Sequence, residues 1–404
     1  MKIVYWGKYI DSYILDTLTP FQELVGEPIH YVLVEKTFTY RQVESRQLVD
    51  PSVNPLTLLP RHGFAEKSMD ILEENHAAIH IFLSFWGEKR LFGVLLRALW
   101  RKHKVAVIFE PYSTAPHAYW KEEGWFSSHL KVLGRHVAYR MLWPIMRLAS
   151  RDKMPCILAV SPLAEEQLHR VGFPAEVVYP FGYFVERKVV EHEQKDKEEV
   201  LRILFSGSLI MRKGLDIAIA AVQRVNSANV KVLLDIYGPG DISKFLKNHL
   251  PGICYKGVYP KGDGQRIISA YDLLLVPSRH DGWGQVVNEA LMQGVPVVVS
   301  DRVGAKCIVE KTGAGIVFKS EDVNDLVNLL KKLALTPNLV DDLKKHAAQV
   351  EKLILPEVGA KYLHDVFINY FGCSQGHRPD AIWCDDEMVK KNIYGSFLKN
   401  NELR

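Results

Sequence analysis

The sequence is poor in cysteine and has no cysteine pattern. Its five cysteines are scattered and include no C-x-x-C pair, so neither a disulfide framework nor a zinc site is expected, and a reducing, cytoplasmic compartment fits best. The five are Cys156, Cys254, Cys307, Cys373 and Cys384. A charged n-region followed by a long apolar run is also missing, and the start, Ile3 to Trp6, is therefore expected to form a first strand and not a signal peptide.

Strong charge excess and membrane-length apolar runs are absent as well. The formal net charge is only +4 over 404 residues, which excludes a dedicated nucleic-acid binder as the leading hypothesis. Since no apolar stretch reaches the length of a membrane span, we expect a soluble protein that is at most peripheral at the inner face of a membrane. A chain of this length exceeds what a single core usually organises, so two domains are expected.

Short apolar runs alternate with helix-like stretches in both halves of the chain. In the first half, strands are expected at 29–35, 79–85, 105–111 and 156–161, with helices at 93–103 and 163–172. Residues 186–200 are dense in charge and read as a solvated linker. The same alternation resumes after the linker, and a long helical stretch, 321–371, is expected to return to the first domain. The role of the residues after 372 stays open.

Alternating strands and helices predict an α/β fold with two doubly wound, Rossmann-like domains whose parallel sheets face a central cleft. The expected division is 1–185 for the first domain, 186–200 for the linker, 201–350 for the second domain and 351–404 for C-terminal helices. Ligands of open α/β sheets bind outside the carboxyl ends of the strands, so the candidate site residues are sought there.

Residues 277–305 hold the first candidate constellation. A loop with Gly282 and Gly284 follows an apolar strand and leads into a helix, where glycine allows a ligand to approach the backbone. The start of that helix offers free N–H groups suited to a phosphate. Asp281 lies in the loop, and Glu289 lies in the second helical turn. Helical spacing alone places Glu289 off the apolar stripe, on a solvated face.

The second constellation, 205–216, joins a strand end at Gly207-Ser208 to a helix that begins after Arg212-Lys213-Gly214. Two cations beside a helix N-terminus are unfavourable unless an anion joins them. A diphosphate would supply this anion, with Arg212 or Lys213 as charge-assisted donors. A solvated basic turn is the alternative reading.

The two constellations together resemble the GT4-type family of retaining glycosyltransferases, which has the GT-B fold. The resemblance rests on Asp281-x7-Glu289, on the G-x5-K-G of Gly207 to Gly214 and on the following V-P-V-V-V-S-D, and it is strongest over 156–320. Three departures stand out: Asp281 replaces the usual glutamate, Ser208 replaces a frequent arginine, and Gly7-Lys8 replaces a double glycine.

The resemblance implies roles for individual residues. Glu289 would bind the ribose of a nucleotide sugar, Asp281 the transferred sugar, and Lys213 with Arg212 the diphosphate. The loop of Gly282, Trp283, Gly284 and Gln285 would line sugar and phosphate, beside Gly207 and Ser208. The first domain would bind the acceptor. No cofactor and no metal are implied, because a UDP- or GDP-sugar is the co-substrate and fixed cations stabilise the leaving group.

Two features of the first domain are less specific. His117, in the loop after the strand at 105–111, resembles in location a histidine that the family has near the anomeric carbon, and Glu110 is the second choice. Residues 89–153 hold thirteen Lys or Arg against four Asp or Glu. Within them, 129–151 interleaves bases with apolar residues, which suits either contact with anionic lipid near a lipid-linked acceptor or a helix with a solvated basic side. Pro144 is expected to split this helix.

The leading hypothesis is therefore transfer of a sugar from a UDP- or GDP-sugar to a hydroxyl of a glycan or lipid-linked saccharide, catalysed with Asp281, Lys213 and His117. Two alternatives keep the fold: a sugar-nucleotide 2-epimerase and a non-catalytic module that binds a sugar nucleotide. A Rossmann dehydrogenase is poorly supported, because no G-x-G-x-x-G follows the first strand.

Overall fold

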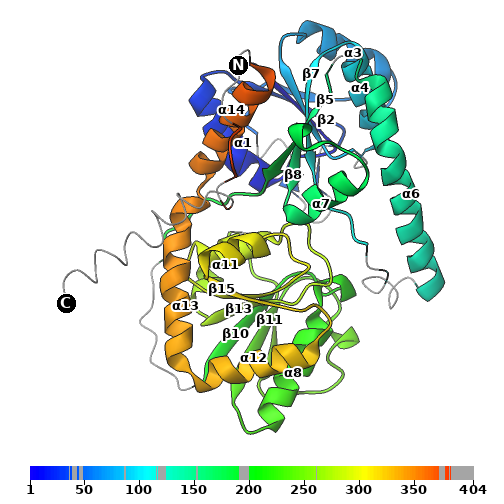
Figure 1. Ribbon diagram of the computed structural model, residues 1–404. Helices are drawn as coiled ribbons and strands as arrows, with labels where there is room; N and C mark the ends of the chain where they lie inside the picture. Colours follow the sequence, from blue (N-terminus) through cyan, green and yellow to red (C-terminus); the bar gives the residue numbers. More distant parts are fainter. Residues whose placement is uncertain are drawn as a thin grey trace. The chain divides into compact units, whose positions relative to one another are not determined.

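The computed structural model divides the chain into two compact units. The first comprises Met1–Tyr112, Arg135–Phe184 and Pro356–Ala381, and the second comprises Ser113–Gly134, Val185–Leu355 and Ile382–Arg404. Each unit is built on one parallel sheet (Figure 1). The residues that the structure describes are 1–35, 37–38, 43–44, 49–85, 88–114, 116, 124–151, 153–190, 200–260, 262–372, 378–381 and 383.

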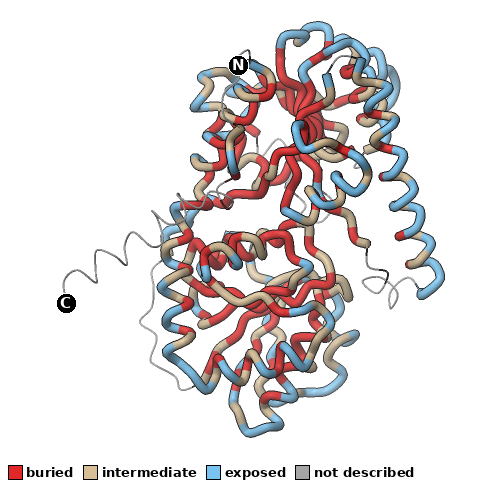
Figure 2. Tube along the Cα trace, in the orientation of Figure 1, coloured by how far each residue is buried: buried red, intermediate tan, exposed pale blue. Residues whose placement is uncertain are grey.

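The first unit holds a seven-stranded sheet in the order β5-β2-β1-β6-β7-β8-β9, with every neighbouring pair parallel. Its strands are β1 Ile3–Gly7, β2 Ile29–Leu33, β5 Leu56–Leu58, β6 Ile79–Leu83, β7 Lys104–Phe109, β8 Cys156–Val160 and β9 Val178–Phe181. The central strands are buried along their length (Figure 2) because their near-continuous apolar residues suit a sheet covered on both faces. The strands expected from the sequence are confirmed.

The helices of the first unit are α1 Ser12–Val25, α3 Phe64–Glu74, α4 Lys89–Trp100, α7 Pro162–Arg170, α14 Pro356–Phe371 and the later turns of α6 Trp125–Ala149. α14 packs against α1, although more than 300 residues separate them in the chain. A small antiparallel pair, β3 Thr37–Phe38 and β4 Val43–Glu44, stands apart from the main sheet.

The predicted break of α6 at Pro144 is wrong, since the helix continues through this residue. Proline removes a single helical hydrogen bond, the one to the carbonyl of Arg140 four residues earlier. Pro144 and Arg140 are both exposed, so water can satisfy that carbonyl, while buried Leu142 and Met146 anchor the helix on either side of the proline.

The second unit holds a six-stranded parallel sheet in the order β12-β11-β10-β13-β14-β15. The strands are β10 Leu201–Ser206, β11 Val232–Tyr237, β12 Ile253–Gly257, β13 Leu273–Val276, β14 Val297–Ser300 and β15 Gly315–Phe318. The helices are α8 Leu215–Ser227, α9 Gly264–Ser269, α10 Gln285–Leu291, α11 Lys306–Thr312, α12 Val323–Leu335 and α13 Pro337–Val350. Short 3-10 turns are η2 Ala175–Val177 in the first unit, and η3 Met211–Lys213, η4 Ile242–Lys244 and η5 Glu351–Leu353 in the second.

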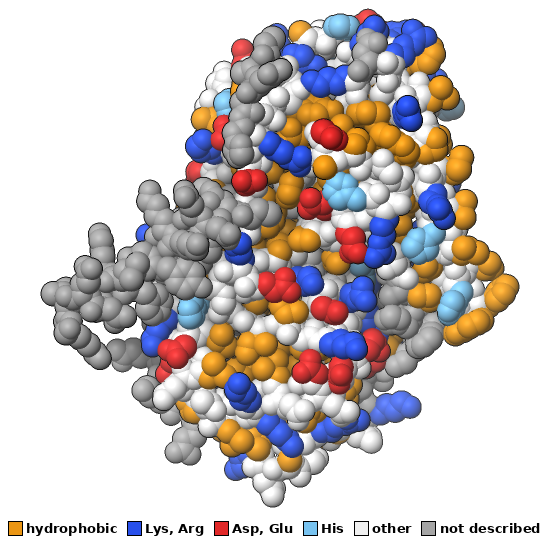
Figure 3. Space-filling view, in the orientation of Figure 1, with side chains coloured by type: hydrophobic (Ala, Val, Ile, Leu, Met, Phe, Trp, Pro, Cys, Tyr) orange, Lys and Arg blue, Asp and Glu red, His pale blue; other side chains and the backbone are white. Residues whose placement is uncertain are grey.

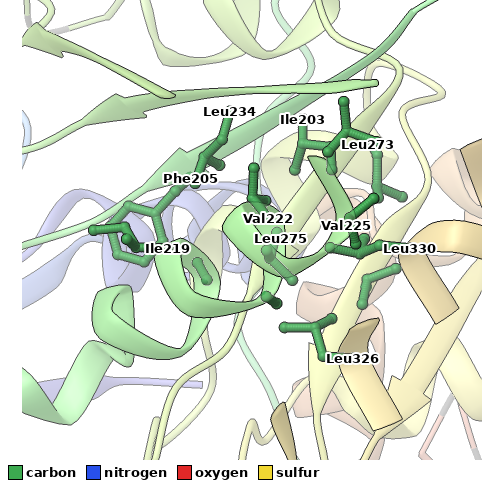
Figure 4. Close-up of a cluster of buried hydrophobic side chains, with 14 of the residues drawn as sticks. Ile203, Phe205, Ile219, Val222, Val225, Leu234, Leu273, Leu275, Leu326 and Leu330 are labelled. Atoms are coloured by element: carbon green, nitrogen blue, oxygen red, sulfur yellow. The ribbon is translucent and has the colours of Figure 1, made fainter. Parts of the chain in front are cut away.

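Helices cover this second sheet in two groups. α8 packs against α12, and the apolar side chains between them and the strands form the buried cluster of Figure 4. α10 and α11 pack against α13. The strand order reverses between β10 and β13, so the loops that follow these two strands diverge at a topological switch point, where open α/β sheets bind their ligands.

A buried arginine ties the loops after β10 and β13 together. Arg279 is 5% exposed, and its guanidinium donates two bonds to Asp216 at the start of α8, at 2.7 and 2.9 Å, and also pairs with Glu321. The same guanidinium donates to the carbonyl of Met211 at 2.6 Å, and the Arg279 amide donates to the carbonyl of Arg212 at 2.8 Å. Charge and backbone bonds together fix the η3 turn against the 277–284 loop.

Replacing Arg279 by methionine should lower the free energy of unfolding by about 2 kcal/mol. This is less than the roughly 3–5 kcal/mol expected for breaking a fully buried pair, because Asp216 and Glu321 keep contact with water. Urea unfolding measures the loss. The exposed Arg302→Met is the matched control and should change the free energy of unfolding by less than about 0.5 kcal/mol. Equal effects of the two substitutions would show that the bonds of Arg279 do not stabilise the two loops.

Candidate active site

The loops after β10 and β13 meet because a glycine allows them to. Gly214 ends the η3 turn with φ +72°, a left-handed conformation that glycine adopts without strain. A methyl group added there would lie 2.0 Å from the carbonyl oxygen of Pro277, the residue after β13. Any side chain at 214 would therefore push the two loops apart. The sequence marks this glycine within G-x5-K-G, and its close approach to Pro277 explains why the position needs it.

Lys213 and Asp281 form the centre of the site. The Lys213 ammonium lies 2.5 Å from Oδ2 of Asp281, and both side chains are largely buried. Burial acts to raise the pKa of the Asp281 carboxyl, but the Lys213 ammonium and the Arg212 guanidinium outweigh burial and lower that pKa below its usual 3.8. Asp281 is therefore a carboxylate at neutral pH, held beside a cation.

The backbone around Asp281 is fixed by its neighbours in the chain. The Asp281 amide donates to the carbonyl of Arg302 at 3.0 Å, and the Asp281 carbonyl accepts from Gly304 at 3.1 Å. This short parallel bridge links the loop after β13 to the segment after β14. Because both segments leave neighbouring strands, the carboxylate is carried on a braced loop and its position is preorganised.

The residues of the predicted phosphate loop surround the Lys213–Asp281 pair. Arg212 lies beside it and donates to the carbonyl of His280 at 2.8 Å. Gly207 faces the Lys213 chain, with 3.9 Å between an added methyl group and Cδ, and Ser208 follows at the loop tip, partly exposed. Gly238, with φ +150°, packs its Cα so closely on Gly207 that an added methyl group would lie 1.8 Å from the Gly207 carbonyl oxygen.

At the turn into α10, Gly282 and Gln285 are partly exposed, as a ligand site requires, whereas the Trp283 side chain is buried. Gly284 adopts φ +87° and faces Val303, where an added methyl group would lie 2.7 Å from a side-chain carbon, so glycine is required there. Trp283 turns inward, is 2% exposed and donates its indole N–H to Asn288 at 2.8 Å. Its side chain therefore belongs to the core and leaves only its backbone for a ligand. Gly282 and Gln285 stay partly exposed at this turn.

Glu289 does not lie on the solvated face that helical spacing indicated. It is half-buried, and a methyl group added at Gly264 of α9 would lie 3.3 Å from its Oε2 and 3.4 Å from the ring of Tyr259. Spacing along α10 alone missed this because α9 packs against α10 and covers the face that carries Glu289.

Three further side chains at the carboxyl ends of the strands were not singled out from the sequence. Ser206 ends β10 and forms a 2.7 Å hydrogen bond with the hydroxyl of Tyr259, which follows β12. Tyr237 ends β11 and its ring lies 5.6 Å from that of Tyr259, centroid to centroid. Strand-end positions could have indicated Ser206 and Tyr237. Tyr259 had no such signal, because its loop comes near Glu289 only through the packing of α9.

Of the two candidate residues in the first half of the chain, His117 and Glu110, the structure describes only Glu110. His117 lies outside the described residues. Glu110, directly after β7, accepts a hydrogen bond from the hydroxyl of Tyr183. The ring of Tyr183 lies 4.7 Å from that of Tyr13, whose hydroxyl donates to Asp11 at 2.5 Å. Burial and the neighbouring carboxylates raise the pKa values of both tyrosines, so each hydroxyl keeps its proton. The segments that follow the carboxyl ends of β1, β7 and β9 thus bring carboxylates and aromatic rings together.

The described residues contain neither a candidate metal centre nor a candidate membrane span. No group of three or more His, Cys, Asp or Glu among them is arranged to hold a metal ion. In the same residues, no helix has both the length and the apolar character needed to cross a membrane.

Solved structures resemble this chain over nearly its whole length. HepE of Anabaena in complex with UDP and glucose superposes with a TM-score of 0.64 at 13% identity, covering 90% of this chain and 98% of HepE. Sucrose-phosphate synthase of Thermosynechococcus elongatus gives a TM-score of 0.65 at 15% identity, covering 93% and 100%. At these identities the likeness shows the fold, which is the GT-B arrangement expected from the sequence.

Sequence relatives cover less of the chain. The amylovoran biosynthesis glycosyltransferase AmsK of Erwinia amylovora is 27% identical over 213 residues, which is 50% of this chain and 52% of AmsK. Alpha-D-kanosaminyltransferase of Streptomyces kanamyceticus is 22% identical over 229 residues, or 52% and 59%. This chain thus spans about half the length of these curated relatives. The family model "Glycosyl transferases group 1" matches residues 187–350, the segment that carries Lys213, Asp281 and Glu289. Over residues 187–350 the chain therefore carries a glycosyl transferases group 1 domain.

Proposed function

We propose that this protein is a retaining glycosyltransferase that moves a sugar from a UDP- or GDP-sugar to a hydroxyl of a glycan or lipid-linked saccharide. One observation carries the proposal: Lys213 and Asp281 pair at the switch point of the sheet, with Glu289 on the adjoining helix α10, and all three lie inside the family match. A switch point that presents fixed cations and carboxylates suits a ligand with both phosphate and hydroxyl groups.

The diphosphate is assigned to Lys213 and Arg212. The Lys213 ammonium has three donors and spends one on Asp281, which leaves two for phosphate oxygens. Glycine at 207 lets a phosphate approach the backbone beside the ammonium. Fixed cations placed where negative charge develops stabilise the departing nucleoside diphosphate, because they need no reorganisation during the reaction.

The hydroxyl-rich parts of the donor are assigned to the two acids. Asp281 is ionised, braced through its backbone and suited to accept hydrogen bonds from the transferred sugar. Glu289 is assigned to the ribose, and Tyr259 and Ser206 lie on the same side of the sheet edge as further polar neighbours. Residue 281 is one methylene shorter than the family's usual glutamate, so the sugar must sit closer to this loop.

Retention follows from a front-face reaction in this proposal. The leaving phosphate takes the proton from the acceptor hydroxyl as the glycosidic bond forms on the same face of the sugar, and the protein contributes orientation and charge. His117 is assigned a place near the anomeric carbon. In this proposal the cations that face the diphosphate are side chains of the chain itself, Lys213 and Arg212, so no step is assigned to a metal ion.

The relatives support a nucleotide-sugar donor. HepE has been crystallised with UDP-glucose, at 14% identity and a TM-score of 0.63, and AmsK is a glycosyltransferase of amylovoran biosynthesis. A UDP-hexose is therefore the first donor to test. For the acceptor, the partly exposed ring of Tyr13 and the exposed carboxylate of Glu110 are the groups that a sugar could contact, and the buried Asp11 and Tyr183 hold them through hydrogen bonds.

Donor binding gives the first test. UDP-glucose should raise the melting temperature of the chain, because a ligand that binds only the native state stabilises it. Lys213→Ala and Glu289→Ala should each weaken binding by about 10- to 100-fold, the value of a hydrogen bond to a charged group. Calorimetric titration with UDP-glucose and GDP-mannose measures both affinity and base preference.

The matched controls for these two variants are Lys332→Ala on α12 and Asp341→Ala on α13, both exposed positions of the second unit. Neither should change donor affinity. Wild-type affinity in both Lys213→Ala and Glu289→Ala would reject the assignment of the site.

Asp281 gives a test of turnover. Asp281→Asn keeps the shape of the side chain but removes the charge that orients Lys213 and accepts hydroxyl hydrogens, and it should lower the transfer rate by about a hundredfold. The rate is followed as release of nucleoside diphosphate with acceptor present. Asp281→Glu retains the charge and should keep most of the activity. An Asn variant as fast as the wild type would remove Asp281 from the mechanism.

A further inference from the structure

Helix α6, Trp125–Ala149, is apolar on two opposite faces. Its inner face packs into the protein through buried Ser128, Val132, Tyr139, Leu142 and Met146. Its outer face, which we define by six side chains that are 52–77% exposed, consists of Phe126, Leu130, Leu133, Val137, Met141 and Leu148. At 100° per residue these six positions lie within about 40° of the direction opposite the inner face.

This outer face concentrates the exposed apolar surface of the described residues. Counting Trp125, α6 carries seven of their fifteen exposed large hydrophobic side chains. A helix that is apolar all round is normally buried all round, and a contiguous exposed apolar patch marks an interaction site. Scattered exposed leucines, by contrast, need no explanation. The regular spacing over about six turns therefore points to a surface that something covers.

The charge on α6 identifies the kind of surface that fits. The helix contains four bases, Lys131, Arg135, Arg140 and Arg147, and no Asp or Glu. Arg140 and Arg147 lie along one border of the outer face, together with His129 and His136, and neither arginine forms an ion pair within the part of the chain that the structure describes. Figure 3 shows hydrophobic, basic and histidine side chains along the right-hand edge, over α6.

We propose that the outer face of α6 docks on an anionic lipid surface, with the helix lying in the plane of the interface. Apolar side chains that enter the boundary of the acyl chains, bordered by Arg that meets lipid phosphates, are the features of an interfacial helix. The helix is 25 residues, about 37 Å, long and offers its outer face along that length. Aromatic Trp125 and Phe126 at its start suit the headgroup level.

A second copy of the chain fits this face less well. In a two-fold contact the same patch meets itself, which brings the border with Arg140 and Arg147 of one copy near the equivalent bases of the other. No acidic side chain on α6 offsets that repulsion. An anionic bilayer instead attracts each of these bases.

Docking on a lipid surface and the proposed reaction use different residues of the chain. None of the docking residues belongs to the Lys213–Asp281 site, and lipid binding can be measured without turnover. If the proposed function holds as well, docking brings the enzyme to lipid-linked acceptors. Failure of one assay leaves the other result intact.

The test uses the full chain and vesicles of defined composition. We expect co-sedimentation with vesicles of phosphatidylglycerol and phosphatidylcholine in a 1:3 ratio (about 25% anionic lipid), much weaker binding to pure phosphatidylcholine, and a loss of binding as salt rises. The triple variant Leu130→Ser, Leu133→Ser, Val137→Ser should reduce binding at least about tenfold. The double variant Arg140→Gln, Arg147→Gln should reduce it about fivefold per base.

The matched control is the triple variant Leu24→Ser, Val53→Ser, Leu335→Ser, whose side chains are 52–68% exposed and lie outside α6. It should bind vesicles as the wild type does. All variants should keep the wild-type melting temperature to within a few degrees and the same stabilisation by UDP-glucose, which separates loss of docking from loss of fold.

Three results would overturn the proposal. The first is wild-type protein that stays in solution with anionic vesicles. The second is an equal loss of binding in the α6 and control variants. The third is a wild-type dimer, seen by light scattering, that the α6 triple variant converts to a monomer, because a second copy would then cover this face.

Discussion

The arrangement of the second unit depends on one buried guanidinium. Arg279 bonds to Asp216, to Glu321 and to the carbonyl of Met211, and so joins the segment after β13 to the turn before α8. These are the loops that carry Asp281 and Lys213. A charge this deeply buried is stable only while its partners stay in place, so the same bonds that satisfy Arg279 also restrict the loops to one geometry. The proposed donor site is thereby preformed by an interaction that contacts no ligand.

Glycine complements the arginine by removing bulk where the loops touch. Gly214 brings the η3 turn onto Pro277, and Gly284 admits the segment of Val303 beside Asp281. Gly214 acts on the same contact as the buried cation, between the loops after β10 and β13, whereas Gly284 acts on the contact between the loop after β13 and the segment after β14. The parallel sheet below supplies the third element, because its order reverses between β10 and β13 and leaves this edge open.

The sequence predicts the elements better than it predicts how they contact each other. Apolar runs indicated the parallel strands and the two Rossmann-like sheets, since local patterning decides which segments are buried. It did not reveal Arg279, whose partners stand 63 and 42 positions away. It placed Glu289 on a solvated face because the cover provided by α9 is a tertiary contact, and it broke α6 at Pro144 because the anchoring of both halves is tertiary as well. The roles of Asp281, Lys213 and Glu289 remain predictions.

The Lys213–Asp281 pair has a consequence for the end of a catalytic cycle. With no anion bound, the ammonium already has a counter-ion 2.5 Å away, so neither charge is left unsatisfied. In the proposed reaction the ammonium keeps this carboxylate as a partner while its two other donors bind the diphosphate. The carboxylate therefore neutralises part of the positive charge that the diphosphate meets, which moderates the affinity for the departing nucleoside diphosphate. When the diphosphate leaves, the ammonium still has its counter-ion and needs none from solution.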